Sequence, residues 1–158
     1  MIISEIVTVM LKLIGILLTG SIALFFSANS IGSSPVEEAV QKRIKMFKSS
    51  GTNIKKLNQL IRSGDFSSSV ALVDFHVKFS EEMRLLFPVG SEASTSNGSD
   101  ASSDIWRDTS GFEKQIQQYN LSAIELKEAV QSKNINLINK NFEGLIKSCK
   151  SCHKQFRN

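Results

Sequence analysis

After residue 34, four stretches of the chain place apolar residues three and four positions apart, a spacing that puts them on one face of an α-helix. No stretch shows the two-residue alternation of a half-buried strand. The pattern therefore predicts an all-α protein with four long helices. The inward faces of the first, third and fourth helices are Val36, Val40, Arg43, Phe47, Ile54, Leu57 and Ile61; Phe112, Ile116, Tyr119, Ala123, Leu126 and Val130; and Ile138, Phe142, Leu145, Cys149, Cys152 and Phe156.

The first of these helices has clear signals at both ends. Ser34 can cap its N-terminus, Pro35 suits the first turn, and Glu37 completes a Ser-x-x-Glu capping box. Gly64 follows the last apolar position and can adopt the left-handed conformation that ends a helix. We expect the helix to begin at Pro35 and to stop at Gly64.

The other boundaries follow from similar signals. The second helix should start within residues 65–68 and end at Phe87, before Pro88. Ser110 and Glu113 form a second capping box, which should start the third helix. The polar residues 131–136 should connect the third helix to the fourth. Residues 88–104, which are rich in Ser, Gly, Asn and Ala, predict a long surface loop that buries no core.

Four helices with mostly short connections favour an antiparallel four-helix bundle, a fold that places cofactors between facing helices. The length of 158 residues suits one such domain, expected over residues 31–158, preceded by an N-terminal extra of residues 1–30.

That N-terminal segment is read as an export signal. Residues 13–28 are almost continuously apolar, Lys12 precedes them, and Ala28 and Ser30 offer a cleavage site after Ser30. A run of about sixteen residues is short for spanning a bilayer. The alternative is an uncleaved membrane anchor extending back to Ile6, with Lys12 snorkelling to the membrane surface.

Charge and cysteine content argue against two classes of protein, nucleic-acid-binding proteins and proteins held together by several disulfides. The net charge is +4, but the 19 basic residues are scattered among 15 acidic ones, which gives little support for nucleic-acid binding. The two cysteines lie in one short motif, Cys149-Lys150-Ser151-Cys152-His153, so a long-range disulfide framework is excluded.

Cys-x-x-Cys-His is the attachment signature of c-type haem. On a helix these three residues share one face, so two thiols can reach the haem vinyl groups while His153 reaches the iron. A structural zinc site would need four ligands, and His76 and carboxylates are all that the chain adds. A thioredoxin-like pair would begin a helix in a βαβ unit, whereas this motif closes the last helix. We therefore expect one covalently bound haem c.

The C-terminal sequence resembles the cytochromes c-prime, the class II c-type cytochromes. Their Cys-x-x-Cys-His-x-x-Phe/Tyr-Arg pattern matches the ending from Cys149 to Arg157. Similar stretches surround Arg43, Pro88 and Trp106, so the resemblance covers residues 36–157. It implies a four-helix bundle with haem on the C-terminal helix, and a homodimer is common in that family.

The resemblance also implies the roles of individual residues. His153 would be the axial ligand, Phe47 would close the other haem face, Arg43 would pair with a haem propionate, and Arg157 would lie near the proximal side. Relatives with an apolar residue at the Phe47 position are five-coordinate and high-spin, and those with methionine are six-coordinate and low-spin. Met46 lies about 100° around the helix from the apolar stripe and should point elsewhere.

We therefore expect a periplasmic electron carrier that exchanges electrons with redox partner proteins, is not an enzyme, and has an open sixth position able to bind small gases. The alternative is a protein that binds or detoxifies nitric oxide or carbon monoxide with little carrier role. A membrane-tethered carrier is the reading that follows from an uncleaved N-terminus. Arg43 could also pack its stem and extend its charge to water. His76 is expected on the helix surface.

Overall fold

The computed structural model describes residues 33–158, so the predictions made for residues 1–30 lie outside its described part. Residues 33–158 form one compact unit. None of the helices in this unit is both long and apolar enough to cross a membrane. The helices, in chain order, are α2 (Pro35–Ser63), α3 (Phe66–Met83), α4 (Asp104–Arg107), α5 (Thr109–Ser132) and α6 (Ile135–Phe156).

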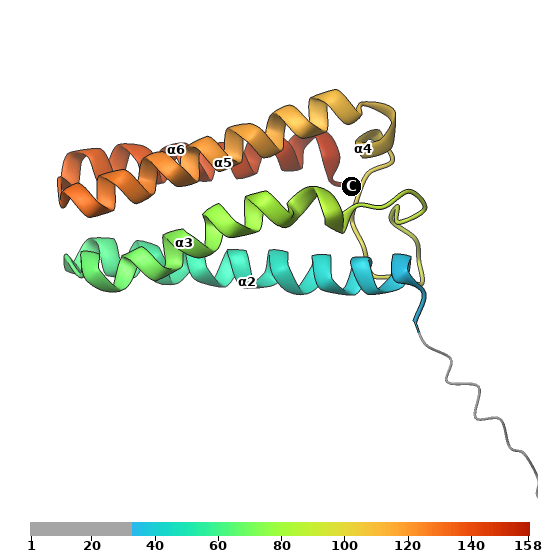
Figure 1. Ribbon diagram of the computed structural model, residues 1–158, viewed down its shortest axis with the longest axis horizontal. Helices are drawn as coiled ribbons and strands as arrows, with labels where there is room; N and C mark the ends of the chain where they lie inside the picture. Colours follow the sequence, from blue (N-terminus) through green and yellow to red (C-terminus); the bar gives the residue numbers. More distant parts are fainter. Residues whose placement is uncertain (1–32) are drawn as a thin grey trace, which may run out of the picture. The chain divides into compact units, whose positions relative to one another are not determined.

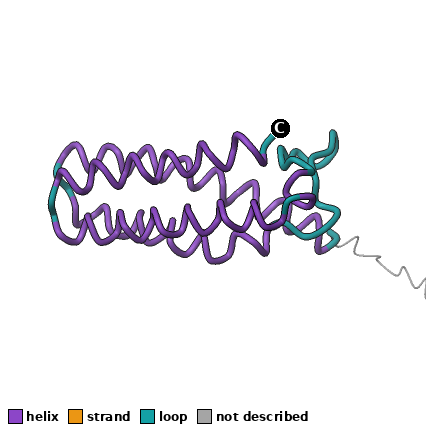
Figure 2. Tube along the Cα trace, turned by 90° about the horizontal axis from the view of Figure 1, so that it is seen from above, coloured by secondary structure: helices purple, strands orange, loops and turns teal. Residues whose placement is uncertain are grey.

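The four long helices alternate in direction along the bundle (Figure 1). The α2–α3 hairpin packs against the α5–α6 hairpin mainly through α3 and α5, whereas α2 and α6 touch far less. The long connection between α3 and α5 lies at the same end as the C-terminus, as Figure 2 shows. The prediction of an all-α antiparallel four-helix bundle is confirmed.

The predicted ends of α2 are confirmed as well. The Ser34 hydroxyl accepts a hydrogen bond of 3.1 Å from the backbone N–H of Glu37. Pro35 occupies the first turn, where the missing N–H costs nothing. Gly64 has a φ of 76°, the left-handed conformation that glycine adopts without strain.

Three predicted boundaries need correction. The second helix stops at Met83 and continues as a 3-10 turn, Arg84–Leu86, before Pro88. Asp108, not Ser110, caps α5: its carboxylate accepts from the backbone N–H of Gly111 at 2.9 Å. The α5–α6 connection spans only Lys133 and Asn134, because the Asn134 side chain caps α6 and so the helix starts earlier than predicted.

The core of the bundle is built mostly from the predicted apolar stripes of α2, α5 and α6, together with apolar side chains of α3. Most side chains at these positions are buried, and Phe47, Ile54 and Phe142 are partly buried. Removal of apolar surface from water is the main stabilising contribution to a fold of this kind. The largest of the fully buried apolar side chains are Phe79, Phe112, Leu57, Leu126, Ile138 and Leu145.

The loop between α3 and α5 runs over the surface only in part: residues 94–96 are exposed, as its composition predicts, but other parts are buried. Ala101, Ser91, Ser99 and Ser102 are all buried. The backbone N–H of Ser102 donates to the Phe156 carbonyl at 3.0 Å, and Ala101 forms a β-bridge with Arg157. These polar residues can be buried because the C-terminal end of α6 and the buried Arg43 form hydrogen bonds with them.

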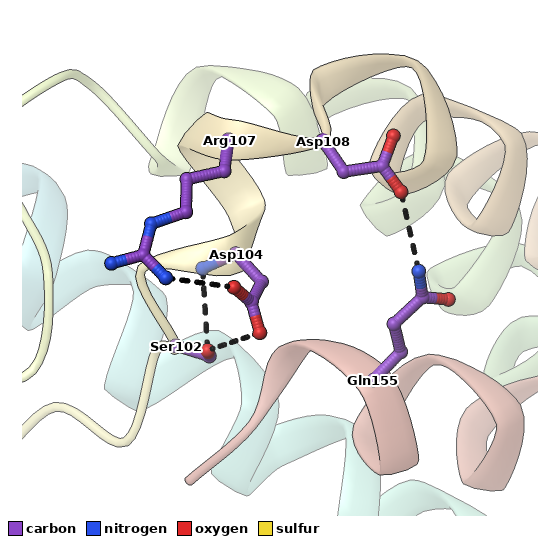
Figure 3. A network of polar contacts seen from close by, with 5 residues as sticks. All are labelled: Ser102, Asp104, Arg107, Asp108 and Gln155. Atoms are coloured by element: carbon purple, nitrogen blue, oxygen red, sulfur yellow. Dashed lines mark hydrogen bonds and ion pairs between the residues drawn. The ribbon is translucent and has the colours of Figure 1, made fainter.

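A small polar network fastens the end of α6 to the start of α5 (Figure 3). The carboxylate of Asp108, which caps α5, also accepts from the Gln155 side chain on α6 at 3.2 Å. In the same view, Ser102 and Arg107 both contact Asp104 on α4. The Asp108–Gln155 contact joins the last turn of α6, two residues after His153, to the start of α5.

Candidate haem site

The six site residues predicted from the sequence line one cavity of ≈ 550 Å³. Residues of α2, α3, α5 and α6 and of the 98–101 segment line it. Its size lies within the range of small-molecule and cofactor pockets. The six residues are Arg43 and Phe47 on α2, Cys149, Cys152 and His153 on α6, and Arg157 just after α6.

The α6 wall carries the attachment motif on one face. Cys149 and Cys152 are half-buried, and His153 reaches the exposed edge of the cavity. Burial raises the pKa of the Cys149 thiol, and burial together with the neighbouring Cys149 raises the pKa of Cys152 to about 11. Thiols of this kind stay protonated at neutral pH, unlike the low-pKa cysteines of thioredoxin-like redox pairs.

The surroundings of the His153 imidazole favour its neutral form. Partial burial lowers its pKa, and the nearby positive charge of Arg157 lowers it further. Neutral imidazole is the form that ligates metals. The side chain therefore has the protonation state that an axial ligand to iron requires.

The α2 wall faces this motif with an aromatic ring. The ring centroids of Phe47 and His153 are 6.2 Å apart, and Phe47 packs edge-on against Phe79 at 5.0 Å. Met46, the residue before Phe47 on α2, packs against the core and does not line the cavity. Met83 at the end of α3 does line it, which the sequence reasoning did not consider.

Arg43 is buried, and its charged end does not extend to water. Its guanidinium donates to the Leu86 carbonyl at 3.0 Å and to the Ser91 hydroxyl at 2.9 Å. It also donates to the Ser91 carbonyl and the Ser99 hydroxyl, both at 2.6 Å. Its Cζ atom lies 4.6 Å above the Phe87 ring. The guanidinium thus ties α2 to the loop, and of its five N–H groups only Nε–H has no bond among these.

Arg157 lies at the cavity edge and pairs with the same loop. Its guanidinium contacts the Asp100 carboxylate at 2.6 and 3.1 Å, and both side chains are more than half exposed. An exposed pair of this kind contributes little to stability. Its effect is to hold the loop against the end of α6 beside His153.

The prediction for His76 is wrong. This side chain is fully buried rather than on the helix surface, and its Nδ1 atom lies 2.6 Å from the Tyr119 hydroxyl. It does not line the cavity, whereas Tyr119 does. The three-four spacing of α3 is apolar around much of the helix, so position alone did not reveal which side His76 faces.

The cavity fits the group that the motif implies. Two cysteine thiols and a neutral imidazole lie on one helix face, and the walls opposite and beside them are mostly aromatic and aliphatic. Such a site can hold a flat, largely apolar macrocycle through two covalent links and one metal ligand, with Cys149, Cys152 and His153 in those roles.

Comparison with known proteins agrees with a haem site. A family model described as Cytochrome C' matches residues 38–157. No curated protein sequence matches the chain. Among solved structures, cytochrome c' from Thermochromatium tepidum has a TM-score of 0.70 at 18% identity, covering 79% of this chain and 97% of its own.

Two further structures show the same fold. A cytochrome c' with ligand-controlled dimer dissociation has a TM-score of 0.73 at 19% identity, covering 80% of this chain and 98% of its own. A nitric oxide complex of a cytochrome c prime variant from Alcaligenes xylosoxidans has a TM-score of 0.69 at 21% identity, covering 78% and 95%. These likenesses establish the bundle, and the family model, which spans most of the chain, establishes the family. The protein therefore belongs to the cytochrome c' family of haem proteins, which carry covalently bound haem c.

Proposed function

We propose that this protein is a periplasmic electron carrier whose haem iron keeps an open sixth position. In this proposal, Cys149 and Cys152 form the thioether links and His153 is the axial ligand. The observation that carries the proposal is the wall opposite His153. It is formed by Phe47, whose side chain has no atom that can ligate iron.

The haem supplies reversible one-electron chemistry and a coordination site, and the chain sets how both are used. Aromatic side chains on α2 and α3 keep water away from the distal face, since Phe47 packs against Phe79 and Phe87. Low polarity around an iron centre is one of the main ways in which a protein tunes its potential.

The positive charges at the cavity have different roles. Four hydrogen bonds to Leu86, Ser91 and Ser99 occupy the terminal nitrogens of Arg43. Its Nε–H therefore remains for the haem propionate that the resemblance assigns to it. Arg157, which is exposed and bonded only to Asp100 among these contacts, is the more accessible partner for a propionate.

Two features of solved relatives support gas binding and dimer formation for this chain. One relative is described as a nitric oxide complex, and another as having ligand-controlled dimer dissociation. An apolar distal wall without a competing ligand is what a small neutral gas requires. We assign the same gas binding, and a homodimer, to this protein.

The alternative is a protein that binds or detoxifies nitric oxide or carbon monoxide and carries few electrons. The same Phe47 wall favours this function, because it offers no ligand that a gas would have to displace. The remaining parts of the proposal are a periplasmic location, redox partner proteins and the absence of an enzymatic reaction. They rest on the export signal expected in residues 1–30 and on the family.

Two measurements together separate the two functions. They are an optical redox titration, run under argon and then under carbon monoxide, and stopped-flow electron exchange with protein partners. An electron carrier should give a reversible one-electron wave under argon and reduce a soluble cytochrome rapidly in stopped-flow mixing. A dedicated gas binder should bind carbon monoxide but exchange electrons slowly with every protein partner offered. Slow exchange with all partners would contradict the carrier function.

A further inference from the structure

A histidine and a tyrosine lie in contact inside the bundle, away from solvent. His76 on α3 is fully buried, and Tyr119 on α5 is 5% exposed. The Nδ1 atom of His76 and the Tyr119 hydroxyl oxygen are 2.6 Å apart. The attachment motif uses neither residue.

The length of this hydrogen bond bears on which atom donates, and the pKa values of the two side chains show that both are neutral. A separation of 2.6 Å is shorter than the usual N–H···O range but within the range for an O–H donor. Burial raises the pKa of Tyr119, and burial lowers the pKa of His76 to about 4. Both groups are therefore neutral, and the short separation favours the tautomer of His76 in which Nδ1 accepts from the Tyr119 hydroxyl.

The other nitrogen of His76 has no partner. Nε2 is buried without a hydrogen bond, a costly arrangement for a polar atom in a packed core. A pair that served packing alone would be better filled by apolar side chains of the same shape. The unpaired Nε2 atom of His76 therefore points to a role that needs an imidazole beside the phenol.

The pair is placed against the haem cavity. Tyr119 lines the cavity together with Cys149 and Ser50, and Cys149 is near enough to contribute to the raised pKa of Tyr119. His76 stands behind Tyr119, outside the cavity wall. An electron leaving the phenol therefore has the haem site beside it, and the proton has His76 on the opposite side.

We propose that Tyr119 is a one-electron donor to the haem, with His76 as the acceptor of its proton. The oxidant is hydrogen peroxide. One peroxide and two solvent protons become two waters, using one electron from ferrous haem and one from Tyr119. The phenolic proton moves to Nδ1 of His76, so the products are ferric haem, a neutral tyrosyl radical and a histidinium ion. This inference rests on the haem being held in the cavity.

The composition of the chain makes the test sharp. Tyr119 is its only tyrosine and Trp106 its only tryptophan. Anaerobic ferrous holoprotein is mixed with one equivalent of hydrogen peroxide, freeze-quenched and examined by electron paramagnetic resonance. We expect a tyrosyl radical beside the ferric signal, and its hyperfine pattern should narrow in protein grown with ring-deuterated tyrosine.

Variants separate the donor from the proton acceptor. Tyr119→Phe should abolish the tyrosyl signal, and Trp106→Phe, the matched aromatic control, should leave it unchanged. His76→Phe removes the proton acceptor and should slow radical formation on the order of 100-fold, the lower range for a positioned proton transfer. His76→Gln offers an acceptor oxygen and should restore part of the rate. This variant also tests the role of His76 if His76→Phe is poorly folded.

A radical that survives Tyr119→Phe, or the absence of any tyrosyl signal in intact holoprotein, would overturn the proposal. An unchanged rate in both His76 variants would overturn the role of His76. A pyridine haemochrome assay on the same samples reports whether haem is bound. Failure of haem attachment is therefore distinguished from failure of the radical chemistry.

Discussion

The ring of His153 on α6 stands 6.2 Å from the ring of Phe47 on α2, measured between centroids. The two residues are more than one hundred positions apart in the sequence, and the bundle brings them to opposite walls of one cavity. One wall carries the expected metal ligand and the other offers none. The predictions below follow from this asymmetry and from the contacts that maintain it.

Covalent attachment should depend on both cysteines. In the double variant Cys149→Ala/Cys152→Ala, acidified organic solvent should extract all the haem, because no thioether remains. Ser151→Ala, an exposed position between the cysteines, is the control and should retain its haem. If haem also extracts freely from the unmodified protein, the attachment role of the motif is wrong.

Stability should depend on the haem. Without it, apolar side chains from several helices face a cavity of ≈ 550 Å³. Protein expressed without haem attachment should melt on the order of 10 °C lower, which corresponds to about 3 kcal/mol for a domain of this size. Circular dichroism at 222 nm measures both helicity and melting. Full helicity with an unchanged Tm would count against this prediction.

Arg43 should act chiefly as a clamp on the loop. Arg43→Met leaves buried acceptors at Leu86, Ser91 and Ser99 without a donor, so the free energy of unfolding should fall by about 2–4 kcal/mol. Urea denaturation measures the loss, and protease cleavage within residues 92–98 should accelerate.

The control for Arg43 is Lys42→Met, which removes an exposed ion pair with Glu82 and should cost less than about 1 kcal/mol. Arg43→Lys tests the geometry, since an ammonium cannot reproduce four bonds from a planar guanidinium. If Arg43→Lys instead keeps full stability and changes only the redox potential, pairing with a propionate is the main role.

His76 should make stability depend on pH. Its pKa is about 4 in the folded protein, against an ordinary value of 6.5, so the unfolded chain binds more protons between these values. Stability should therefore fall as the pH drops from 6.5 towards 4, by up to about 3 kcal/mol. Urea denaturation of the holoprotein at several pH values measures the slope. An equal slope in His76→Phe would show that other groups cause it.

Much of this arrangement could be predicted from the sequence. The bundle, the ends of α2 and the face that carries Cys149, Cys152 and His153 follow from local spacing and capping signals. Phe47 was assigned to the cavity by its register with Arg43 and by family resemblance. These features depend on residues within a few turns of one another, and such short-range information is what helical periodicity records.

The features that were missed depend on contacts between distant segments. Arg43 finds its acceptors in the 86–99 segment, and Ser91 and Ser99 of the Ser-rich loop are buried because those contacts exist. The burial of His76 depends on Tyr119, 43 positions later. Asp108 caps α5 in place of the predicted Ser110, and its carboxylate also accepts a hydrogen bond from Gln155 on α6. Sequence spacing does not contain these partners.

The open site should close when a thioether is placed in it. Phe47→Met puts a sulfur ligand on the α2 wall, so the ferric protein should change from high-spin to low-spin and bind carbon monoxide more slowly. Met46→Ala and Met83→Leu remove the other two methionines of α2 and α3, and neither should alter the spin state of the unmodified site. A low-spin protein that becomes high-spin only with one of these controls would identify that methionine as the native ligand.

The most direct measurement is the absorption spectrum of the unmodified ferrous protein, before and after carbon monoxide is added. With His153 on one side and Phe47 on the other, the spectrum should be high-spin, and the gas should shift the Soret band without first displacing a protein ligand. A low-spin ferrous spectrum that carbon monoxide leaves unchanged would show a sixth ligand from the chain and would contradict the open site.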